Sequence, residues 1–194
     1  SVMRFQDELK RLSREKIPCF IVSGNHDPLK ERRVGSFLPE GCHLFGNEPD
    51  FREITTLKGQ KVVIYGISYN DSEERNNLAK KLIQFYKPKD GIKLALIHCN
   101  VGKQGSHENY APCTLEELKQ APFDAWLLGH IHEKVVLSKS HPLIVYPGNI
   151  QGRHIRESGR RGVSLISFSA SNDPELIFIP ISEVVWNSGE TSIE

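Results

Sequence analysis

Histidine, asparagine and aspartate side chains close three short apolar runs of this 194-residue chain. The groups are Gly-Asn-His-Asp at residues 24–27 after the run 17–22, His98 after the run 94–97, and Gly-His-Ile-His at residues 129–132 after the run 126–128. Imidazole nitrogens and amide or carboxylate oxygens bind divalent metal ions. Because loops at the carboxyl ends of neighbouring strands converge in one crevice, these groups predict a metal site at a sheet edge.

Each group has a plainer interpretation when it is taken alone. Gly, Asn and Asp are common turn formers, so residues 24–27 could be only a turn. Two strand histidines at positions i and i+2 share a face for many reasons, and His98 alone resembles a histidine at the edge of a core. The three groups together each close a strand-like run, and this conjunction favours the metal site.

In their order along the chain, these groups resemble the calcineurin-like metallophosphoesterases. The motifs of that family run D-x-H, G-D-x-x-D, G-N-H-D/E, H and G-H-x-H. The last three motifs are present, whereas the 194 residues contain neither D-x-H nor G-D-x-x-D. We therefore expect an N-terminally truncated member of the family that begins within a helix–strand unit and lacks the first strands.

The resemblance implies a role for each matching residue. The implied metal ligands are Asn25, His98 and His130 for one ion and His132 for the other. His26 would contact the scissile phosphate or donate to the leaving oxygen, and Asp27 would orient His26. The resemblance also implies two divalent metal ions, of which Mn²⁺ is expected ahead of Fe or Mg. The bridging carboxylate belongs to an absent motif, so we expect an incomplete site, weak metal affinity and little activity from these residues alone.

Residues 146–162 indicate a branch of the family. They resemble the Y-P-G-S/N…E…K/R-G segment of the SbcD-like DNA-repair exonucleases and related bacterial exonuclease-like proteins, which implies a Mn²⁺-dependent DNA exonuclease or endonuclease. Such subunits dimerise and work with a coiled-coil ATPase subunit. Arginine side chains make sequence-independent phosphate contacts. The expected DNA-binding residues are Arg153, Arg156, Arg160 and Arg161, and a solvated basic loop is the alternative.

Composition sets broad limits. With 25 Lys and Arg against 24 Asp and Glu the net charge is +1, so only local clusters can indicate a nucleic-acid partner. The length and the hydrophobic fraction of 38% predict one domain over residues 1–194, with residues 134–182 as its β-rich C-terminal part.

The cysteines and the longest apolar runs bear on location. Cys19, Cys42, Cys99 and Cys113 show no C-x-x-C spacing, which indicates reduced thiols and a cytoplasmic location. No apolar stretch of the sequence approaches the ~20 residues that cross a bilayer, so no membrane partner is expected.

Hydrophobic periodicity predicts helices early in the chain and strands late. A helix is expected over 4–16, a helical segment after residue 27, and a helix over 71–86 that opens with a capping-box spacing at 71–74, which recurs at 114–117. The later expected strands are 42–46, 51–57, 61–67, 134–138, 142–146, 162–169 and 175–181. This order predicts an α/β sandwich of two mixed β-sheets flanked by helices.

Two other functions stay open. A phosphatase or cyclic phosphodiesterase for small molecules would use the same ligands, although the arginine-rich segment disfavours it. A non-catalytic scaffold with this fold is the alternative outside the enzymes, and the retention of whole ligand groups disfavours it. His107, Cys113 and His141 match no motif position and are expected to be structural, while the polar residues 106–113 could line a substrate groove.

Overall fold

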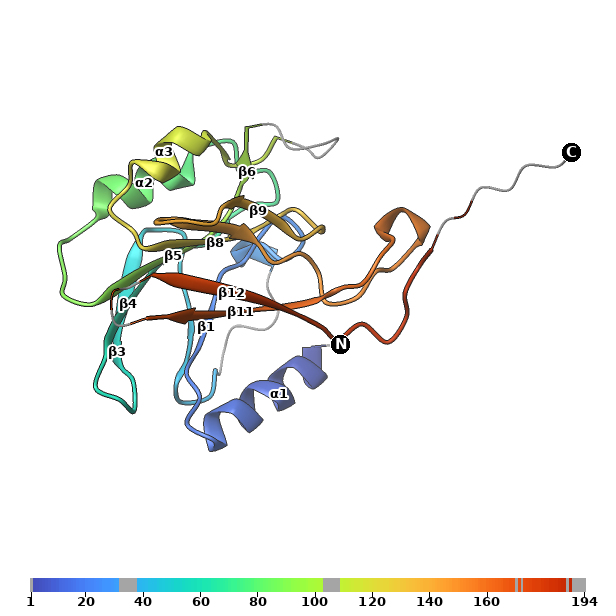
Figure 1. Cartoon of the computed structure of the whole chain (residues 1–194), viewed down its shortest axis with the longest axis horizontal. Coiled ribbons are helices and arrows are strands. Elements are labelled where there is room, and N and C mark those ends of the chain that lie inside the picture. The colour runs from blue at the N-terminus through green and yellow to red at the C-terminus, as the bar shows by residue number, and fades with distance from the viewer. Residues whose placement is uncertain are drawn as a thin grey trace, which may run out of the picture.

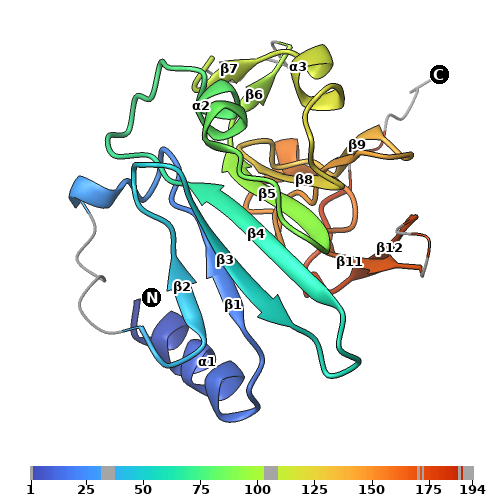
Figure 2. The ribbon, with the colours of Figure 1, turned by 90° about the vertical axis from the view of Figure 1, so that its left-hand side faces the viewer.

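A six-stranded mixed sheet forms the centre of the computed structural model, which describes residues 2–31, 38–102, 109–169, 171, 173–187 and 189. Its strands, in spatial order, are β3 (Asp50–Thr55), β4 (Lys61–Ile67), β5 (Ile92–His98), β8 (Ala125–Gly129), β10 (Leu143–Tyr146) and β9 (Val135–Ser138). The inner four strands are parallel, and β3 and β9 close the two edges in the antiparallel direction. Figure 2 shows β4 and β5 side by side. Parallel strands covered on both faces carry nearly continuous apolar runs, as β4 and β10 do.

Helices α2 (Leu78–Phe85) and α3 (Leu115–Lys119) cover one face of this sheet (Figure 1). Trp126, Tyr65 and Phe123 are fully buried in the core beneath them, and the indole N–H of Trp126 donates to the carbonyl of Leu118 at 3.0 Å. A short parallel pair, β6 (Asn100–Val101) and β7 (Pro112–Cys113), lies beside the helices. The largest side chains therefore anchor the helical layer, and its single buried indole donor is satisfied.

Two small sheets lie on the opposite face. One is the parallel pair β1 (Cys19–Ile21) and β2 (Cys42–Leu44), and the other is the antiparallel hairpin β11 (Gly162–Phe168) and β12 (Pro174–Pro180). Ile166, Phe168 and Leu176 of the hairpin pack against a buried cluster of β8 and β10. The predicted α/β sandwich is confirmed, with the second layer built from two-stranded sheets (Figure 1).

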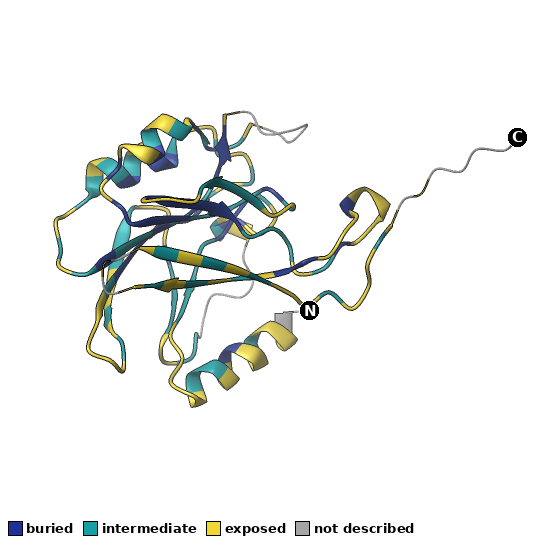
Figure 3. Ribbon diagram, viewed as in Figure 1, coloured by how far each residue is buried: buried dark blue, intermediate teal, exposed yellow. Residues whose placement is uncertain are grey.

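The outward face of the β11–β12 hairpin is apolar. Its cross-strand pairs Val163–Ile179 and Leu165–Ile177 are all exposed, with Leu165 at 52% and Ile177 at 47%. Figure 3 shows the alternation of exposed and half-buried residues along both strands, in contrast to the buried central sheet. The hairpin therefore carries hydrophobic residues on both faces, of which only the inner one packs against the rest of the described structure.

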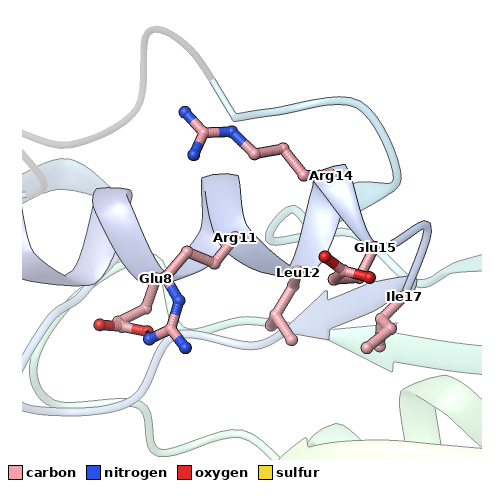
Figure 4. A pocket seen from close by; sticks show the side chains of 6 residues that line it. All are labelled: Glu8, Arg11, Leu12, Arg14, Glu15 and Ile17. Carbon is pink, nitrogen blue, oxygen red and sulfur yellow. Dashed lines mark hydrogen bonds and ion pairs between the residues drawn. The ribbon is translucent and has the colours of Figure 1, made fainter.

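Helix α1 (Val2–Arg14) precedes β1 and is mostly exposed (Figure 3). Leu9 is its buried anchor, at 3% exposure. Figure 4 shows an open pocket along this helix, lined by Glu8, Arg11, Leu12, Arg14, Glu15 and Ile17. An ion pair between Arg11 and Glu8 lies at its rim. None of the metal-motif residues lines this pocket, so it is not the candidate site.

Most predicted elements agree with the structure, and one helix start is wrong. The strand predicted at 61–67 has those bounds, and the capping box at Thr114 and Glu117 forms. The helix predicted from residue 71 begins only at Leu78, with Asn77 as its N-cap. Asp71 instead forms an ion pair with Lys30 at 2.7 Å, so a contact with a distant residue takes the carboxylate that would have capped the helix.

The segment after residue 27 forms only the 3₁₀ turn η1 (Leu29–Glu31), and residues 32–37 lie outside the described part of the chain. Within the described ranges, no helix has the length and apolar character needed to span a membrane.

Candidate functional site

The three motif groups meet where strands of the two layers end. His98 is the last residue of β5 and is the register partner of Gly129, the last residue of β8. Parallel neighbours end at the same sheet edge, so His98 and His130 come together for topological reasons. Asn25 follows β1 in the other layer, and its Oδ1 lies 2.9 Å from Nε2 of His98. This hydrogen bond joins the two layers at the site.

Backbone contacts hold the loop that carries Asn25. The N–H of Ser23 donates to Oγ of Ser68 at 3.0 Å, and the carbonyl of Ser23 accepts the N–H of Tyr69 at 3.0 Å. Ser23 and Ser68 are both buried, at 0% and 1% exposure. Ser68 and Tyr69, just beyond the end of β4, therefore fix the position of the backbone two residues before Asn25.

The ring of His98 fills a space that two glycines leave open. A Cβ added at Gly24 would lie 2.4 Å from the His98 ring, and one added at Gly129 would lie 2.7 Å from its Nδ1. Real Cβ atoms do not approach other atoms this closely, so both motifs begin with glycine for a steric reason. The rings of Tyr69 and His130 also pack against His98 in T-shaped contacts, with centroids 5.1 and 5.2 Å from that of His98.

Burial keeps His98 neutral. Burial, together with the smaller effects of the neighbouring histidines His130, His26 and His132, lowers the pKa of His98 to about 3. The imidazole therefore stays unprotonated at neutral pH, which is the form that binds metal ions.

His130 adopts a backbone conformation that its residue type rarely adopts. Its φ is 104°, in a region that favours glycine. Such strain costs of order 1–3 kcal/mol and persists where the surrounding structure imposes it, often at functional sites. In this conformation the His130 ring makes T-shaped contacts with the rings of His98 and Tyr110, at 5.2 and 6.1 Å between centroids. Nothing in the sequence pattern indicated this strain.

His132 has a buried carboxylate partner. Its Nδ1 lies 2.6 Å from Oε1 of Glu157, and Oε2 of Glu157 accepts the N–H of Arg153 at 2.8 Å. Burial alone raises the pKa of Glu157, but the hydrogen bonds from Arg153, His132 and Asn149 outweigh it and lower the pKa to about 2. Glu157 was not among the predicted site residues, although it is the glutamate of the segment 146–162.

His26 and Asp27 lie at the exposed end of the site. The rings of His26 and His132 are 6.3 Å apart between centroids. Asp27 was expected to orient His26, and its Oδ1 accepts the N–H of Gly24 at 2.9 Å. The carboxylate therefore closes the turn that carries His26.

The four predicted DNA-binding arginines fall into two kinds. Arg153, Arg156 and Arg160 are exposed in or beside the 3₁₀ turn η2 (Ile155–Glu157). Arg161 is only 7% exposed, and its guanidinium donates to the carbonyls of His132 and Ser158. Arg161 therefore differs from the other three arginines, because its guanidinium is buried and two of its nitrogens donate to backbone carbonyls.

The residues expected to be structural make packing contacts where they are described. Nε2 of His141 lies 2.9 Å from Oδ1 of the buried Asp124, and Cys113 lies 3.8 Å from Cys99 between their sulfur atoms. His107 and residues 103–108 lie outside the described ranges, so the suggested lining of a groove by residues 106–113 is described only from residue 109 onward.

The donor types at the site fit a divalent ion in part. Asn25, His98 and His130 offer an amide oxygen and neutral imidazoles, which are ordinary metal ligands. In the described ranges, no three His, Cys, Asp or Glu side chains are placed together as a metal-holding group. The described residues therefore suit one ion through neutral donors, and they complete no centre for two.

Comparisons with known proteins agree with this geometry. A model of the Calcineurin-like phosphoesterase family matches residues 2–134. The chain belongs to this family. The match contains the motif groups at residues 24–27, 98 and 129–132, and it stops before the segment that carries Glu157 and the arginines.

Alignments with three curated relatives cover most of the chain. An uncharacterized metallophosphoesterase, YhaO of Bacillus subtilis, is 29% identical over 188 residues, which are 96% of this chain and 45% of the relative. The DNA double-strand break repair proteins Mre11 of Sulfurisphaera tokodaii and Methanocaldococcus jannaschii are 27% and 24% identical, over 84% and 91% of this chain and 43% and 50% of theirs. The chain thus spans about half the length of the curated relatives it matches.

Proposed function

We propose that this protein is a divalent-metal-dependent phosphodiesterase that cleaves DNA. The observation that supports this most is the meeting of three motif groups at one sheet edge, where Asn25 lies 2.9 Å from His98 and the rings of His98 and His130 are 5.2 Å apart. In this proposal Asn25, His98 and His130 hold one ion, and His132 helps to hold a second. Mn²⁺ is the proposed ion, with Fe or Mg as alternatives.

The exposed residues of the site would handle the substrate. His26 lies beside His132 at the open end, so it can reach a phosphate placed next to the metal ligands. We assign to it the contact with the scissile phosphate and the donation of a proton to the leaving oxygen, while Asp27 holds its turn. The divalent ions, when bound, would stabilise charge on the phosphoryl oxygens and activate a water molecule.

Two features support DNA as the substrate. The two archaeal relatives are named as DNA double-strand break repair proteins. Arg153, Arg156 and Arg160 expose their side chains on the loop that also supplies the partner of His132. Arginine suits the phosphate groups of any DNA sequence. A coiled-coil ATPase subunit and a second copy of this chain are further proposed partners, on the resemblance to SbcD-like nucleases.

Hydrolysis assays test the proposal. The 194-residue chain is compared with the same chain placed behind a segment that supplies D-x-H and G-D-x-x-D, on a chromogenic phosphodiester and on linear DNA with Mn²⁺. We expect activity only in the longer polypeptide, and its loss on His98→Ala. An ion contributes several kcal/mol to the transition state, and each ~1.4 kcal/mol is a factor of ten in rate.

Two outcomes would contradict parts of this proposal. Equal activity of the two polypeptides would show that the metal-ligand assignment is wrong. Hydrolysis of small phosphoesters without hydrolysis of DNA would favour a phosphatase or cyclic phosphodiesterase instead.

A further inference from the structure

We propose that Glu157 is a positioning residue that fixes the ring orientation and the tautomer of His132, and that the segment 146–161 folds around His132 to place it. This rests on the proposed function, in which Nε2 of His132 is a metal donor. The segment would therefore serve the metal centre through buried contacts, in addition to any contact that its exposed arginines make with DNA.

The carboxylate of Glu157 dictates which ring nitrogen carries the hydrogen. Its Oε1 lies 2.6 Å from Nδ1 of His132, and its Oε2 is already occupied by the N–H of Arg153. A carboxylate has only acceptor sites, so a hydrogen bond at this distance needs a hydrogen on Nδ1. A neutral imidazole with its hydrogen on Nδ1 has its lone pair on Nε2, which is the nitrogen left to bind a metal ion.

The same segment also makes hydrogen bonds to the backbone carbonyl of His132. The carbonyl of His132 accepts one hydrogen bond from the guanidinium of Arg161 and another from the N–H of Asn149, the latter at 3.0 Å. The same guanidinium also donates to the carbonyl of Ser158 at 3.0 Å, next to Glu157. Arg161 thereby ties the backbone of His132 to the turn that presents its carboxylate partner.

Close packing supports this arrangement. A Cβ added at Gly148 would lie 2.9 Å from the carbonyl oxygen of His132, and Gly148 has a φ of 79°. The segment can pass this close only because the position is glycine. Glu157 and Arg161 are each 7% exposed. Buried charged side chains of this kind are not expected in a solvated basic loop, because their burial is costly unless they are paired and hydrogen-bonded.

Histidine-specific nuclear magnetic resonance on the 194-residue chain tests the inference directly. With ¹⁵N-labelled histidine, long-range proton–nitrogen correlations report which ring nitrogen of each histidine carries the hydrogen. We expect His132 to carry it on Nδ1 in the wild type. Glu157→Gln replaces one of the two oxygens that accept from His132 and Arg153 by an NH₂ group, which can only donate, so we expect a mixture of tautomers.

Calorimetry with Mn²⁺ gives a second measurement. It is made on the longer polypeptide that supplies D-x-H and G-D-x-x-D, because His132 is assigned to the ion whose other ligands lie in those motifs. Loss of a carboxylate that orients a metal-binding histidine lowers metal affinity by about 10- to 100-fold, and we expect this in Glu157→Gln. Glu175→Gln is the control, because it makes the same chemical change at an exposed position of β12 and should leave both the tautomer and the affinity unchanged.

The outcomes separate this inference from the function on which it rests. Hydrogen on Nε2 of His132 in the wild type would overturn the inference, and this measurement does not depend on the folding of any variant. An unchanged tautomer in a folded Glu157→Gln would overturn it as well. A tautomer that responds to Glu157→Gln, together with Mn²⁺ affinity that is unaffected by His132→Ala, would support the positioning role and contradict the metal assignment of His132.

Discussion

The ring of His98 is the point at which the glycines of two motifs act together. Gly24 and Gly129 stand about a hundred residues apart in the sequence, yet a Cβ at either position would overlap the same imidazole. Neither glycine has the positive φ that often explains a glycine in a turn, so the space beside the ring is the reason for the residue type. The first glycine of each motif is thus explained by close packing against the His98 ring.

Substitution of either glycine should therefore destabilise the protein by displacing His98. For Gly24→Ala we expect a loss of about 1–3 kcal/mol in the free energy of unfolding, the usual cost of overpacking. Urea denaturation measures this loss. Gly46→Ala is the control, because a Cβ there meets no atom within 4 Å, and its effect should stay within about 0.5 kcal/mol. Equal effects of the two substitutions would contradict the steric explanation.

At the scale of elements, contacts with distant residues override local signals at the start of α2. Asp71 has the spacing of a capping residue, but it pairs with Lys30, and Glu74 turns its carboxylate to the N–H of Asn76 at 2.8 Å. The backbone carbonyl of Glu74 also accepts the N–H of Ala111. These contacts hold the residues before α2 outside the helix, which starts where Asn77 can cap it.

The helix start can be tested by comparing two side-chain truncations. Oδ1 of Asn77 accepts the N–H of Lys80 at 2.8 Å, so Asn77→Ala should lower the free energy of unfolding by about 1 kcal/mol or more. Asp71→Ala removes an exposed ion pair with Lys30 and an exposed hydrogen bond from Asn70, and should cost less, at about 0–1 kcal/mol. Thermal or urea unfolding measures both. A larger loss from Asp71→Ala would restore the earlier helix start.

Sequence reasoning predicts fold elements and candidate site residues where the signal lies in a short run or motif. The strand 61–67 is marked by adjacent β-branched and aromatic residues, and Asn25, His98 and His130 are marked by motif spacing. Glu157 was missed because its partner His132 is 25 residues away and no periodic pattern links them. For the same reason Arg161 was grouped with its exposed neighbours, since burial depends on contacts that a basic run does not encode.

At the scale of the whole molecule, two surface regions stand out: the loop with exposed arginines at the site, and the apolar outer face of β11–β12. If the exposed arginines contact DNA phosphates, Arg156→Gln with Arg160→Gln should weaken binding to any duplex and reduce the slope of log K against log salt by about 2. Fluorescence anisotropy across a salt series measures the slope. Arg4→Gln with Arg14→Gln on α1 is the control of equal charge, and an equal change there would assign the effect to net charge alone.

The apolar face should affect surface properties without supporting the fold. Leu165→Thr with Ile177→Thr should reduce the binding of a hydrophobic dye and leave the free energy of unfolding nearly unchanged, because both side chains are about half exposed. Ile166→Thr, at the next position on β11, should instead cost about 1–3 kcal/mol, since Ile166 packs on the buried cluster of β8 and β10. Equal destabilisation by the two changes would show that the outer face also packs.

The hydrogen bond between Asn25 and His98 makes the geometry of the site depend on the short β1–β2 pair. It joins β5 to the loop of β1, and β1 is held to β2 by only three register pairs, none of them fully buried. Short, half-buried pairings open more often than the core does. While this pair is open, Asn25 and His26 have left His98 and His130. The apparent dissociation constant of any ligand of the assembled site would then equal the intrinsic constant divided by the fraction of time that the β1–β2 pair is closed. Hydrogen exchange at Cys19–Ile21 would report this fraction.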